Sequence, residues 1–231
     1  KKHSTMKNKL LLAALMLLVV ATTAFAQKND WKLKKEVDDL KVYFRKGETS
    51  GIKEVKVQFE VQASLRTIVA VLKDVPAFTD WVYSCTEAEL LKRVSDTESI
   101  YYSRIAFPFP MSDRDFIAKS RLTQNPNTKE IFVTVTGDYD YLPQKKDVVR
   151  MPKLIIKWHI QPVSARKAIV NYHLVSNPGG SIPEWAVNMA IDKGPTYSMK
   201  NFREMLKKPK YQQAQLAYIQ EWSGQTASDN R

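Results

Sequence analysis

The sequence predicts an α+β domain in which a curved antiparallel sheet carries a long C-terminal helix laid across it. Residues 54–61 alternate apolar and polar side chains, which is typical of a half-buried strand. Six further strand-like runs follow with short turn signals between them, so consecutive strands are expected to pair antiparallel. After Ser176 the apolar residues recur at helical spacing. A helix over a curved sheet leaves an internal hydrophobic cavity whose size depends on how far side chains fill it.

The first part of the domain is expected to contain two short helices, one on either side of the alternating strand. Asp30 is in position to cap the first helix. The apolar residues of this helix are spaced three and four apart, at Leu33, Val37 and Leu40. Ser64 is in position to cap the second helix, which ends at Pro76. One face of the strand between them carries four apolar residues: Val55, Val57, Phe59 and Val61.

The later runs predict a meander of strands followed by the long helix. The strand-like runs cover 87–93, 100–107, 115–123, 130–138, 153–161 and 167–176. Ser181 is in position to cap the helix, and Pro183 suits its first turn. Gly194 and Pro195 interrupt the helical pattern, which predicts a kink. A last amphipathic piece is expected to cap the domain with Tyr211, Ala214, Tyr218 and Trp222.

The N-terminal residues predict an export signal rather than part of the fold. A basic stretch precedes the uncharged run Leu10–Ala26, which ends in the Ala-Phe-Ala pattern that a signal peptidase recognises. We expect a signal peptide with a short N-terminal extension at 1–26, one domain at 27–231, and a periplasmic or secreted protein. A membrane span is the alternative reading, although this run is at the short limit of the roughly 20 residues that crossing a bilayer requires.

The composition limits the chemistry of the chain. The formal net charge is +12, and the expected leader contributes four of its lysines, so the domain stays basic and suits an anionic membrane surface. The single cysteine, Cys85, cannot form an intrachain disulfide and is interpreted as a small buried hydrophobe. The sequence has no cluster of metal ligands, no glycine-rich phosphate loop and no serine in a nucleophile elbow. We therefore expect no metal, no cofactor and no catalytic residue.

Three segments taken together resemble the START family, the StAR-related lipid transfer domains. They are FPFPMSDRDF from Phe107 to Phe116, the pair Val149-Arg150, and NPGGSIPEW from Asn177 to Trp185. The resemblance implies a helix-grip fold, in which the bent sheet wraps around the C-terminal helix and one lipid lies in the tunnel between them. It also implies a lipid-binding or lipid-transfer protein, which we expect to be a monomer in transient contact with an anionic membrane.

The resemblance and the strand alternation together predict the residues around the ligand. The expected cavity wall consists of Tyr101, Ser103, Ile105, Ala118, Ser120, Trp158 and Tyr172, with Ile182, Trp185 and Met189 on the lid. The loop 106–113 and the helix that begins at Ile182 are expected to form a gate with Phe107, Phe109, Met111, Gly179 and Gly180. Glycine permits the positive φ angles of a sharp strand-to-helix turn. The alternatives are wall residues that simply fill the core and a loop that folds onto its own core.

Two positions depart from the pattern of sterol-binding members of the family. Those members place an acidic residue and an arginine inside the cavity, and the corresponding positions here are Tyr101 and Ser120. Neither is charged, so the resemblance does not indicate a sterol, and the hydroxyl groups are suited to a different headgroup. Arg114 and Asp115 point to opposite faces of a strand, so each is expected to meet its own partner in a structural role.

Two other functions compete with lipid binding. A helix-grip enzyme of the cyclase or hydrolase type would need histidines or carboxylates in the cavity, and His159 and His173 are the candidates. Alternation places them opposite Trp158 and Tyr172, so they face away from the cavity if the aromatic residues line it. The basic charge also prompts nucleic acid binding, but the lysine clusters are not interleaved with stacking aromatic residues. We expect no nucleic acid partner.

Overall fold

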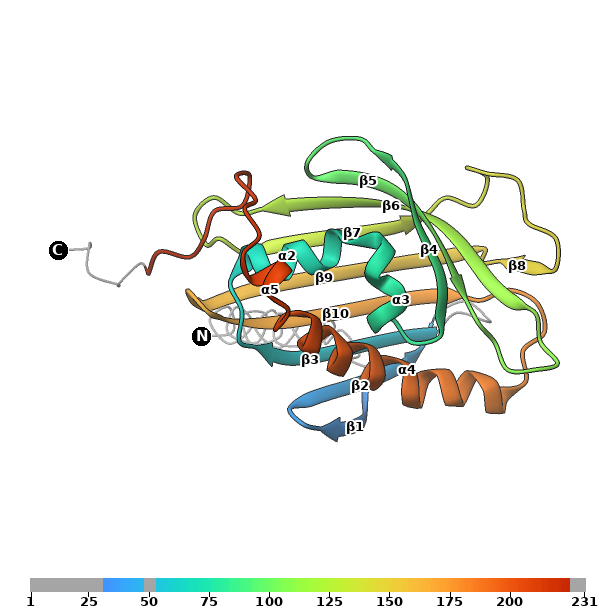
Figure 1. The fold of residues 1–231 in the computed structure, drawn as a ribbon. Coiled ribbons are helices and arrows are strands. Elements are labelled where there is room, and N and C mark those ends of the chain that lie inside the picture. The colour runs from blue at the N-terminus through green and yellow to red at the C-terminus, as the bar shows by residue number, and fades with distance from the viewer. Residues whose placement is uncertain (1–30, 48–52, 225–231) are drawn as a thin grey trace, which may run out of the picture. The chain divides into compact units, whose positions relative to one another are not determined.

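A ten-stranded sheet is the main element of the structure, a computed structural model that describes residues 31–47 and 53–224 (Figure 1). The strands are β1 (Lys32–Val37), β2 (Leu40–Lys46), β3 (Lys53–Val61), β4 (Cys85–Arg93), β5 (Glu98–Ile105), β6 (Asp113–Gln124), β7 (Ile131–Gly137), β8 (Val148–Arg150), β9 (Lys153–Ser164) and β10 (Lys167–Asn177). All of them belong to one compact unit, Lys32–Arg231. The predicted leader at 1–26 lies outside the described residues and stays a prediction.

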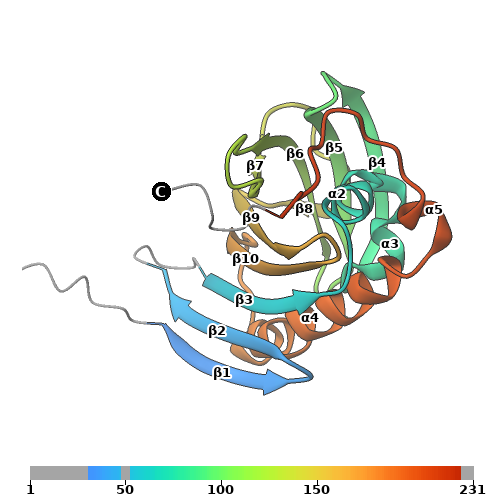
Figure 2. The same ribbon diagram turned by 90° about the vertical axis from the view of Figure 1, so that its left-hand side faces the viewer.

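The strands pair in the order β1-β2-β3-β10-β9-β7-β6-β5-β4, and β8 pairs with β6 in parallel. Every neighbouring pair along that order is antiparallel, which confirms the predicted sheet. Figure 2 shows the sheet curling so that the helices occupy its concave side. Six of the seven later strands lie within three residues of the predicted runs, because short turns separate strongly alternating segments. The short strand β8 was not predicted.

The helices are α2 (Leu65–Lys73), the 3-10 turn η2 (Val75–Ala77), α3 (Phe78–Trp81), α4 (Glu184–Met205) and α5 (Pro209–Gln212). Ser64 caps α2 as predicted, because its side chain accepts a hydrogen bond from the Thr67 amide. The long helix α4 continues through Pro195, so both predicted stripes belong to one element. Within the described part of the chain, none of these helices is both long and apolar enough to cross a bilayer.

The predicted helix after Asp30 is wrong, because the structure has the hairpin β1-β2 there. Asp38 and Asp39 form its two-residue turn at φ angles of 49° and 63°, a conformation that suits right-twisted hairpins. Pairing of β2 with β3 buries Leu40 and Val42 on the core side of the sheet. Leu33, Val37 and Leu40 have helical spacing, but strand pairing decides the structure of this segment.

Two further expectations about helix ends are wrong. Pro183, and not Ser181, occupies the N-cap position of α4, and it makes no side-chain capping hydrogen bond. The expected amphipathic piece near the C-terminus is helical only in the single turn of α5. Beyond α5 the chain forms a C-terminal strap, residues 213–224, without regular helix.

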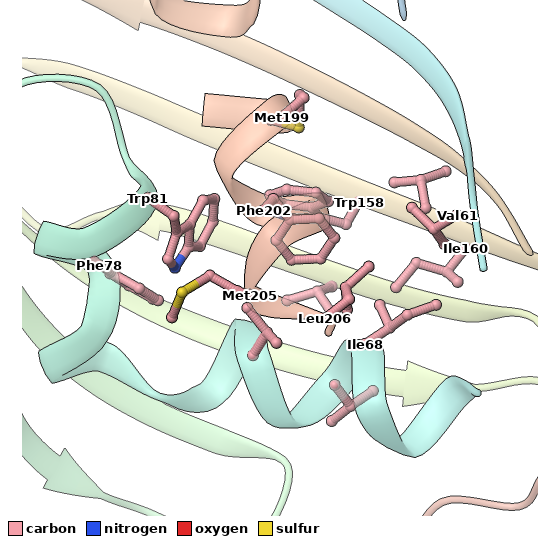
Figure 3. Close-up of a cluster of buried hydrophobic side chains, with 14 of the residues drawn as sticks. Val61, Ile68, Phe78, Trp81, Trp158, Ile160, Met199, Phe202, Met205 and Leu206 are labelled. Atoms are coloured by element: carbon pink, nitrogen blue, oxygen red, sulfur yellow. The ribbon is translucent and has the colours of Figure 1, made fainter. Parts of the chain in front are cut away.

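The core lies between the concave face of the sheet and the second half of α4 (Figure 3). Phe202 is fully buried, and its ring centroid lies 5.2 Å from that of Trp81 and 5.4 Å from that of Trp158. Phe59 of β3 meets the same ring edge to face at 6.3 Å. These aromatic contacts hold α4 against both α3 and the sheet.

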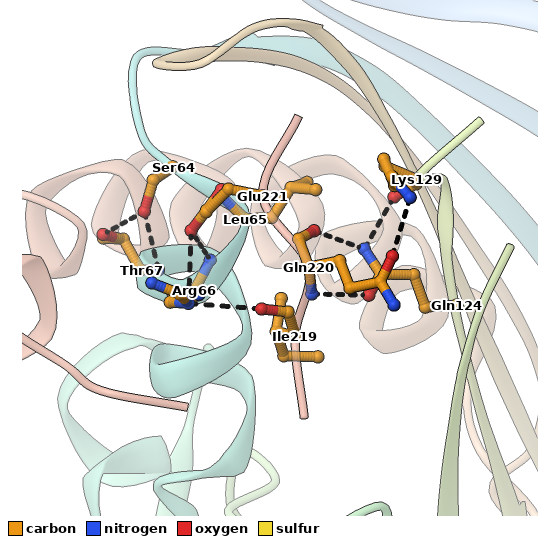
Figure 4. Close-up of polar contacts among 9 residues, drawn as sticks. All are labelled: Ser64, Leu65, Arg66, Thr67, Gln124, Lys129, Ile219, Gln220 and Glu221. Carbon is orange, nitrogen blue, oxygen red and sulfur yellow. Dashed lines mark hydrogen bonds and ion pairs between the residues drawn. The ribbon is translucent and has the colours of Figure 1, made fainter. Parts of the chain in front are cut away.

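The C-terminal strap covers the start of α2 (Figure 4). The Glu221 carboxylate accepts hydrogen bonds from the amides of Leu65 and Arg66 at 3.0 and 2.9 Å, so it satisfies two of the free donors at the helix start. Gln220 and Gln124 exchange a pair of hydrogen bonds that joins the strap to β6. Ile219, the residue before Gln220, is fully buried. The strap thus closes the end of the domain where α2 begins.

Candidate ligand cavity

Two adjoining cavities lie between the sheet and the helices. The outer cavity has a volume of about 240 Å³ and is bordered by the loop after β5, the corner before α4 and α4 itself. The inner cavity has a volume of about 90 Å³ and lies deeper, beside α3. Both are lined by Val82, Phe116, Ile156, Tyr172, Ser198 and Met199. Among the described lining residues of both cavities, none carries a charge.

The inner cavity combines an apolar wall with a few uncharged polar groups. Tyr101 of β5 and Tyr172 of β10 reach it from opposite parts of the sheet, and Ser120 of β6 lies between them in strand order. Burial raises the pKa of both tyrosine hydroxyls, and the neighbouring Tyr172 adds to the shift at Tyr101. Both phenols are therefore neutral hydrogen-bonding groups at physiological pH.

Arg114 holds together the two segments that border the outer cavity. Its guanidinium donates hydrogen bonds to the carbonyl groups of Pro178 and Gly179 at 3.0 and 3.2 Å, and also to the Ser112 carbonyl. It lies 4.6 Å from the centre of the Phe107 ring, which lines the outer cavity. Arg114 is 3% exposed, and burial lowers its pKa. The loop and the corner are thus tied to one buried cation.

Asp115 meets a different partner, as the opposite faces of a strand predict. Its carboxylate pairs with the Arg150 guanidinium at 2.7 and 3.1 Å, and both side chains are 1% exposed. Arg150 also donates to the carbonyl groups of Tyr139 and Leu142. This two-point pair joins β6 to β8 and anchors the loop before β8. Arg114 and Asp115 therefore have structural partners on separate segments.

The corner before α4 needs its two glycines. Gly179 and Gly180 have φ angles of 67° and 64°, which favour glycine. A Cβ on Gly179 would lie 3.0 Å from the Pro152 side chain, and one on Gly180 would lie 3.4 Å from the Arg114 guanidinium. The turn therefore depends on positive φ angles and on close approach to neighbouring segments.

The structure brings seven of the ten predicted wall and lid residues to the cavities. Tyr101, Ser103, Ser120, Trp158 and Tyr172 line the inner cavity, and Ile105, Tyr172 and Ile182 line the outer one. Ala118 is fully buried in the core without lining either cavity. Trp185 is 53% exposed, and Met189 is half-buried; neither lines a cavity. Later residues of α4, including Gly194, Pro195 and Ser198, line the outer cavity instead.

The predicted gate residues lie in three different environments. Phe107 lines the outer cavity, Met111 is half-buried, and Phe109 is 93% exposed. The predicted alternative of a loop folded wholly onto its own core therefore does not hold for Phe109. Phe109 and Trp185 are therefore two exposed aromatic side chains on the segments that border the outer cavity.

Most of the residues that line the cavities from the helices were not predicted from the sequence. Leu72 of α2, Phe78 and Trp81 of α3, and Met199 of α4 line the inner cavity, and Gly194 and Pro195 line the outer one. Their apolar spacing predicted that they pack in the core. Only the fold shows that the side chains leave a cavity beside them. Met151 and Leu154, next to β8 and on β9, also line the outer cavity.

The two histidines considered for a helix-grip enzyme do not line the inner or the outer cavity. His159 stacks on Phe132 at 4.5 Å and lies 3.5 Å from a Glu130 oxygen, whereas His173 lies 3.0 Å from a Glu54 oxygen. Neither histidine lines a cavity. Cys85 is buried against the Ser103 hydroxyl at 3.3 Å, and burial raises its pKa. Within the described ranges, no group of three or more histidine, cysteine, aspartate or glutamate residues could hold a metal ion.

A bent antiparallel sheet that holds a long C-terminal helix, with a cavity between them, defines the helix-grip fold. The START domain family matches residues 13–212, and the chain belongs to this family. Lipid binding and transfer are the activities of START domains.

Known relatives cover most of the chain. It is 30% identical over 203 residues to uncharacterized protein PA1579 of Pseudomonas aeruginosa, a match that covers 88% of this chain and 100% of the relative. It is 28% identical over 170 residues to the phosphatidylcholine transfer protein of Mus musculus, covering 71% of this chain and 78% of the relative.

Solved structures agree with the fold. A fragment of the STAR-related lipid transfer protein from Xanthomonas axonopodis has a TM-score of 0.71 at 33% identity, covering 78% of this chain and 100% of that chain. Human STARD10 has a TM-score of 0.68 at 21% identity, covering 81% of this chain and 78% of that chain, which supports the fold alone.

Proposed function

We propose that this protein binds one lipid in the space between the sheet and α4 and exchanges it at a membrane. The observation that carries the proposal is the pair of adjoining cavities with apolar walls and no charged group among their described lining residues. Burial of apolar ligand surface there would contribute about 25 cal/mol per Å², less the cost of ordering the ligand. Relatives named as a lipid transfer protein and a phosphatidylcholine transfer protein support the class of ligand.

The proposed entrance lies between the loop 106–112 and the start of α4. Phe107 and Ile182 come from these two segments and line the same outer cavity. Arg114 bonds to carbonyl groups of the corner and contacts the Phe107 ring. Opening the entrance would separate groups that share this one buried cation, so Arg114 is expected to set how readily the ligand exchanges.

The proposed membrane contact uses exposed aromatic side chains near this entrance together with the basic charge of the chain. Phe109 and Trp185 belong to the two entrance segments and are 93% and 53% exposed. Large aromatic side chains are favourable at a membrane interface, and basic residues are attracted to anionic headgroups. This arrangement would bring the cavity entrance to the lipid surface.

Native mass spectrometry of the full-length protein, purified without detergent, tests the proposal directly. We expect one lipid per protein molecule, either retained from the host or taken up from vesicles, and extraction would identify it. A protein that carries no lipid and takes none from vesicles of any composition would overturn the proposed function.

Vesicle co-sedimentation tests the membrane contact separately. Phe109→Ser and Trp185→Ser are expected to weaken binding to phosphatidylglycerol-containing vesicles, and rising salt is expected to weaken it further because salt screens charges. Phe132→Ser is the matched control, since Phe132 is an exposed aromatic residue on β7, outside the entrance segments. Binding that the entrance variants and salt both leave unchanged would contradict this part of the proposal.

A further inference from the structure

Three side-chain hydroxyls at the wall of the inner cavity have no hydrogen-bond partner among the described residues. They belong to Tyr101, Tyr172 and Ser120. The neighbouring Ser103 hydroxyl, by contrast, is engaged with the Cys85 sulfur. A hydroxyl at a cavity wall without a protein partner takes its hydrogen bond from water or from a bound ligand, so these three hydroxyls mark a place where the polar group of a ligand would fit.

The chemistry of this cluster favours an uncharged partner. Phenol and serine hydroxyls donate and accept hydrogen bonds, and the cavity offers no described carboxylate, lysine or arginine to neutralise a charged headgroup. An isolated charge in an apolar site is strongly disfavoured. A hydroxyl, ester or ketone oxygen of a ligand can form hydrogen bonds with the same hydroxyl groups without the free-energy cost of burying a charge.

The volume of the two cavities favours a lipid with one acyl chain rather than two. The inner and outer cavities measure about 90 and 240 Å³ and share a wall at Tyr172 and Met199. Pockets for drug-sized ligands measure about 300 to 1,000 Å³, so this space is at the small end of that range. The polar cluster is at the inner end, and the outer cavity is lined mostly by apolar side chains. A ligand with one polar end and one chain fits this order.

We propose that the inner cavity binds the uncharged, oxygen-bearing end of a single-chain lipid through Tyr101, Tyr172 and Ser120, while the chain runs through the outer cavity toward the entrance. The proposal deepens the proposed lipid-binding function and rests on it. It assigns the headgroup to the interior, so the selectivity of the protein is set by three hydroxyl groups on strands that the sheet brings together.

Lipids with one acyl chain and different headgroups test the charge requirement. The full-length protein is incubated with vesicles that contain equal mole fractions of 1-oleoylglycerol, oleoyl lysophosphatidylcholine, oleate and dioleoyl phosphatidylcholine, and bound lipid is quantified after gel filtration. We expect 1-oleoylglycerol to be bound roughly tenfold or more in preference to the zwitterionic and anionic lipids of the same chain. Dioleoyl phosphatidylcholine is expected to bind least.

Single hydroxyl deletions test the contact residues. Tyr101→Phe and Tyr172→Phe are each expected to weaken 1-oleoylglycerol binding about five- to tenfold while the melting temperature of the unliganded protein is kept or raised, since no protein hydrogen bond is lost. Tyr197→Phe is the matched control. Tyr197 is on α4, 48% exposed, and lines neither cavity.

The outcomes separate this inference from the proposed function. Equal or tighter binding of lysophosphatidylcholine or oleate would overturn the uncharged headgroup, and equal binding of dioleoyl phosphatidylcholine would overturn the single chain. Both results would leave lipid binding intact. Tyrosine variants that bind 1-oleoylglycerol as tightly as Tyr197→Phe would remove the assigned contacts. A protein that binds none of the four lipids but carries another lipid in native mass spectrometry would overturn this inference, whereas one that carries no lipid at all would overturn the proposed function itself.

Discussion

The two halves of α4 pack in different ways although they form one continuous helix. In the half after Gly194, Met199, Phe202 and Met205 are almost fully buried against α3 and the sheet. In the half before it, Trp185 is 53% exposed, and Lys193 is also exposed. The outer cavity lies at the junction, where Gly194 and Pro195 line it. The second half therefore anchors the helix, whereas the first half packs less completely and borders the proposed entrance.

The largest expected effect separates an anchor residue from an entrance residue. Phe202→Ala should lower the free energy of unfolding by about 3 to 5 kcal/mol, because it removes a buried ring and leaves a cavity. Trp185→Ala should lower it by about 0.5 kcal/mol or less, because the side chain is largely exposed, but it should weaken binding to vesicles. Denaturant unfolding and vesicle co-sedimentation measure the two effects. Similar stability losses in both variants would contradict the different packing of the two helix halves.

The buried ion pair that joins β6 to β8 should contribute more to stability than an exposed ion pair. Asp115→Asn should lower the free energy of unfolding by about 3 kcal/mol, since it leaves the Arg150 guanidinium buried without a counter-charge. The exposed pair of Glu204, on α4, and Lys207, just beyond the end of this helix, provides the control. Glu204→Gln there should change the free energy of unfolding by less than about 1 kcal/mol. A small effect of Asp115→Asn would show that the carbonyl contacts of Arg150 are sufficient.

Two glycine variants should have opposite effects on stability. Gly179→Ala should lower the free energy of unfolding by about 1 to 3 kcal/mol, because the corner requires a positive φ angle and the new methyl group would meet Pro152. Gly194→Ala should raise it by up to about 1 kcal/mol, since alanine favours the helix and its Cβ would meet Tyr83 at an ordinary contact distance of 3.5 Å. Thermal unfolding measures both variants. A stabilising Gly179→Ala would contradict the assigned turn.

The smallest expected effect concerns a carboxylate on the sheet, away from α4. Burial raises the pKa of Glu54, but hydrogen bonds from Arg45 and His173 outweigh burial, so the pKa lies below its usual value of 4.5. Its contribution to stability is therefore present above pH 4.5 and is lost as the pH falls through the lower native pKa. Glu54→Gln should lower the free energy of unfolding by about 1 to 2 kcal/mol at pH 7 and by much less in acid.

A second carboxylate on the same strand serves as the control for Glu54. Glu60 is 50% exposed at its side chain and pairs with Lys167 at 2.8 Å. Glu60→Gln should change stability by less than about 1 kcal/mol at either pH. Equal pH profiles for the two variants would contradict the assigned role of burial and of the two hydrogen bonds at Glu54.

Local periodicity predicted the elements better than it predicted their surroundings. The alternation of Val55, Val57 and Phe59 became the buried face of β3, and Ser64 caps α2. The same kind of pattern failed at Leu33 and Leu40, because hairpin pairing decided that segment. Trp185 was expected on the lid from family correspondence, but its orientation depends on how α4 sits on the sheet. Sequence spacing shows which residues share one face of a helix. It does not show how the helix is rotated about its axis, and this rotation decides which face lines the cavity.

The sequence by itself determined the order of strands and helices from β3 onward, apart from the short β8. It also determined the need for a glycine corner and the absence of a charge at Tyr101 and Ser120, because these depend on neighbouring residues and on residue identity. The tertiary structure decided which residues meet. Asp115 pairs with Arg150 across the parallel strands β6 and β8, and Tyr101 and Tyr172, from strands far apart in the sheet, line the same inner cavity. The cavity volume was also decided there. It is the space left after side chains from distant segments have packed, and a small difference between large filled volumes cannot be obtained from any local pattern.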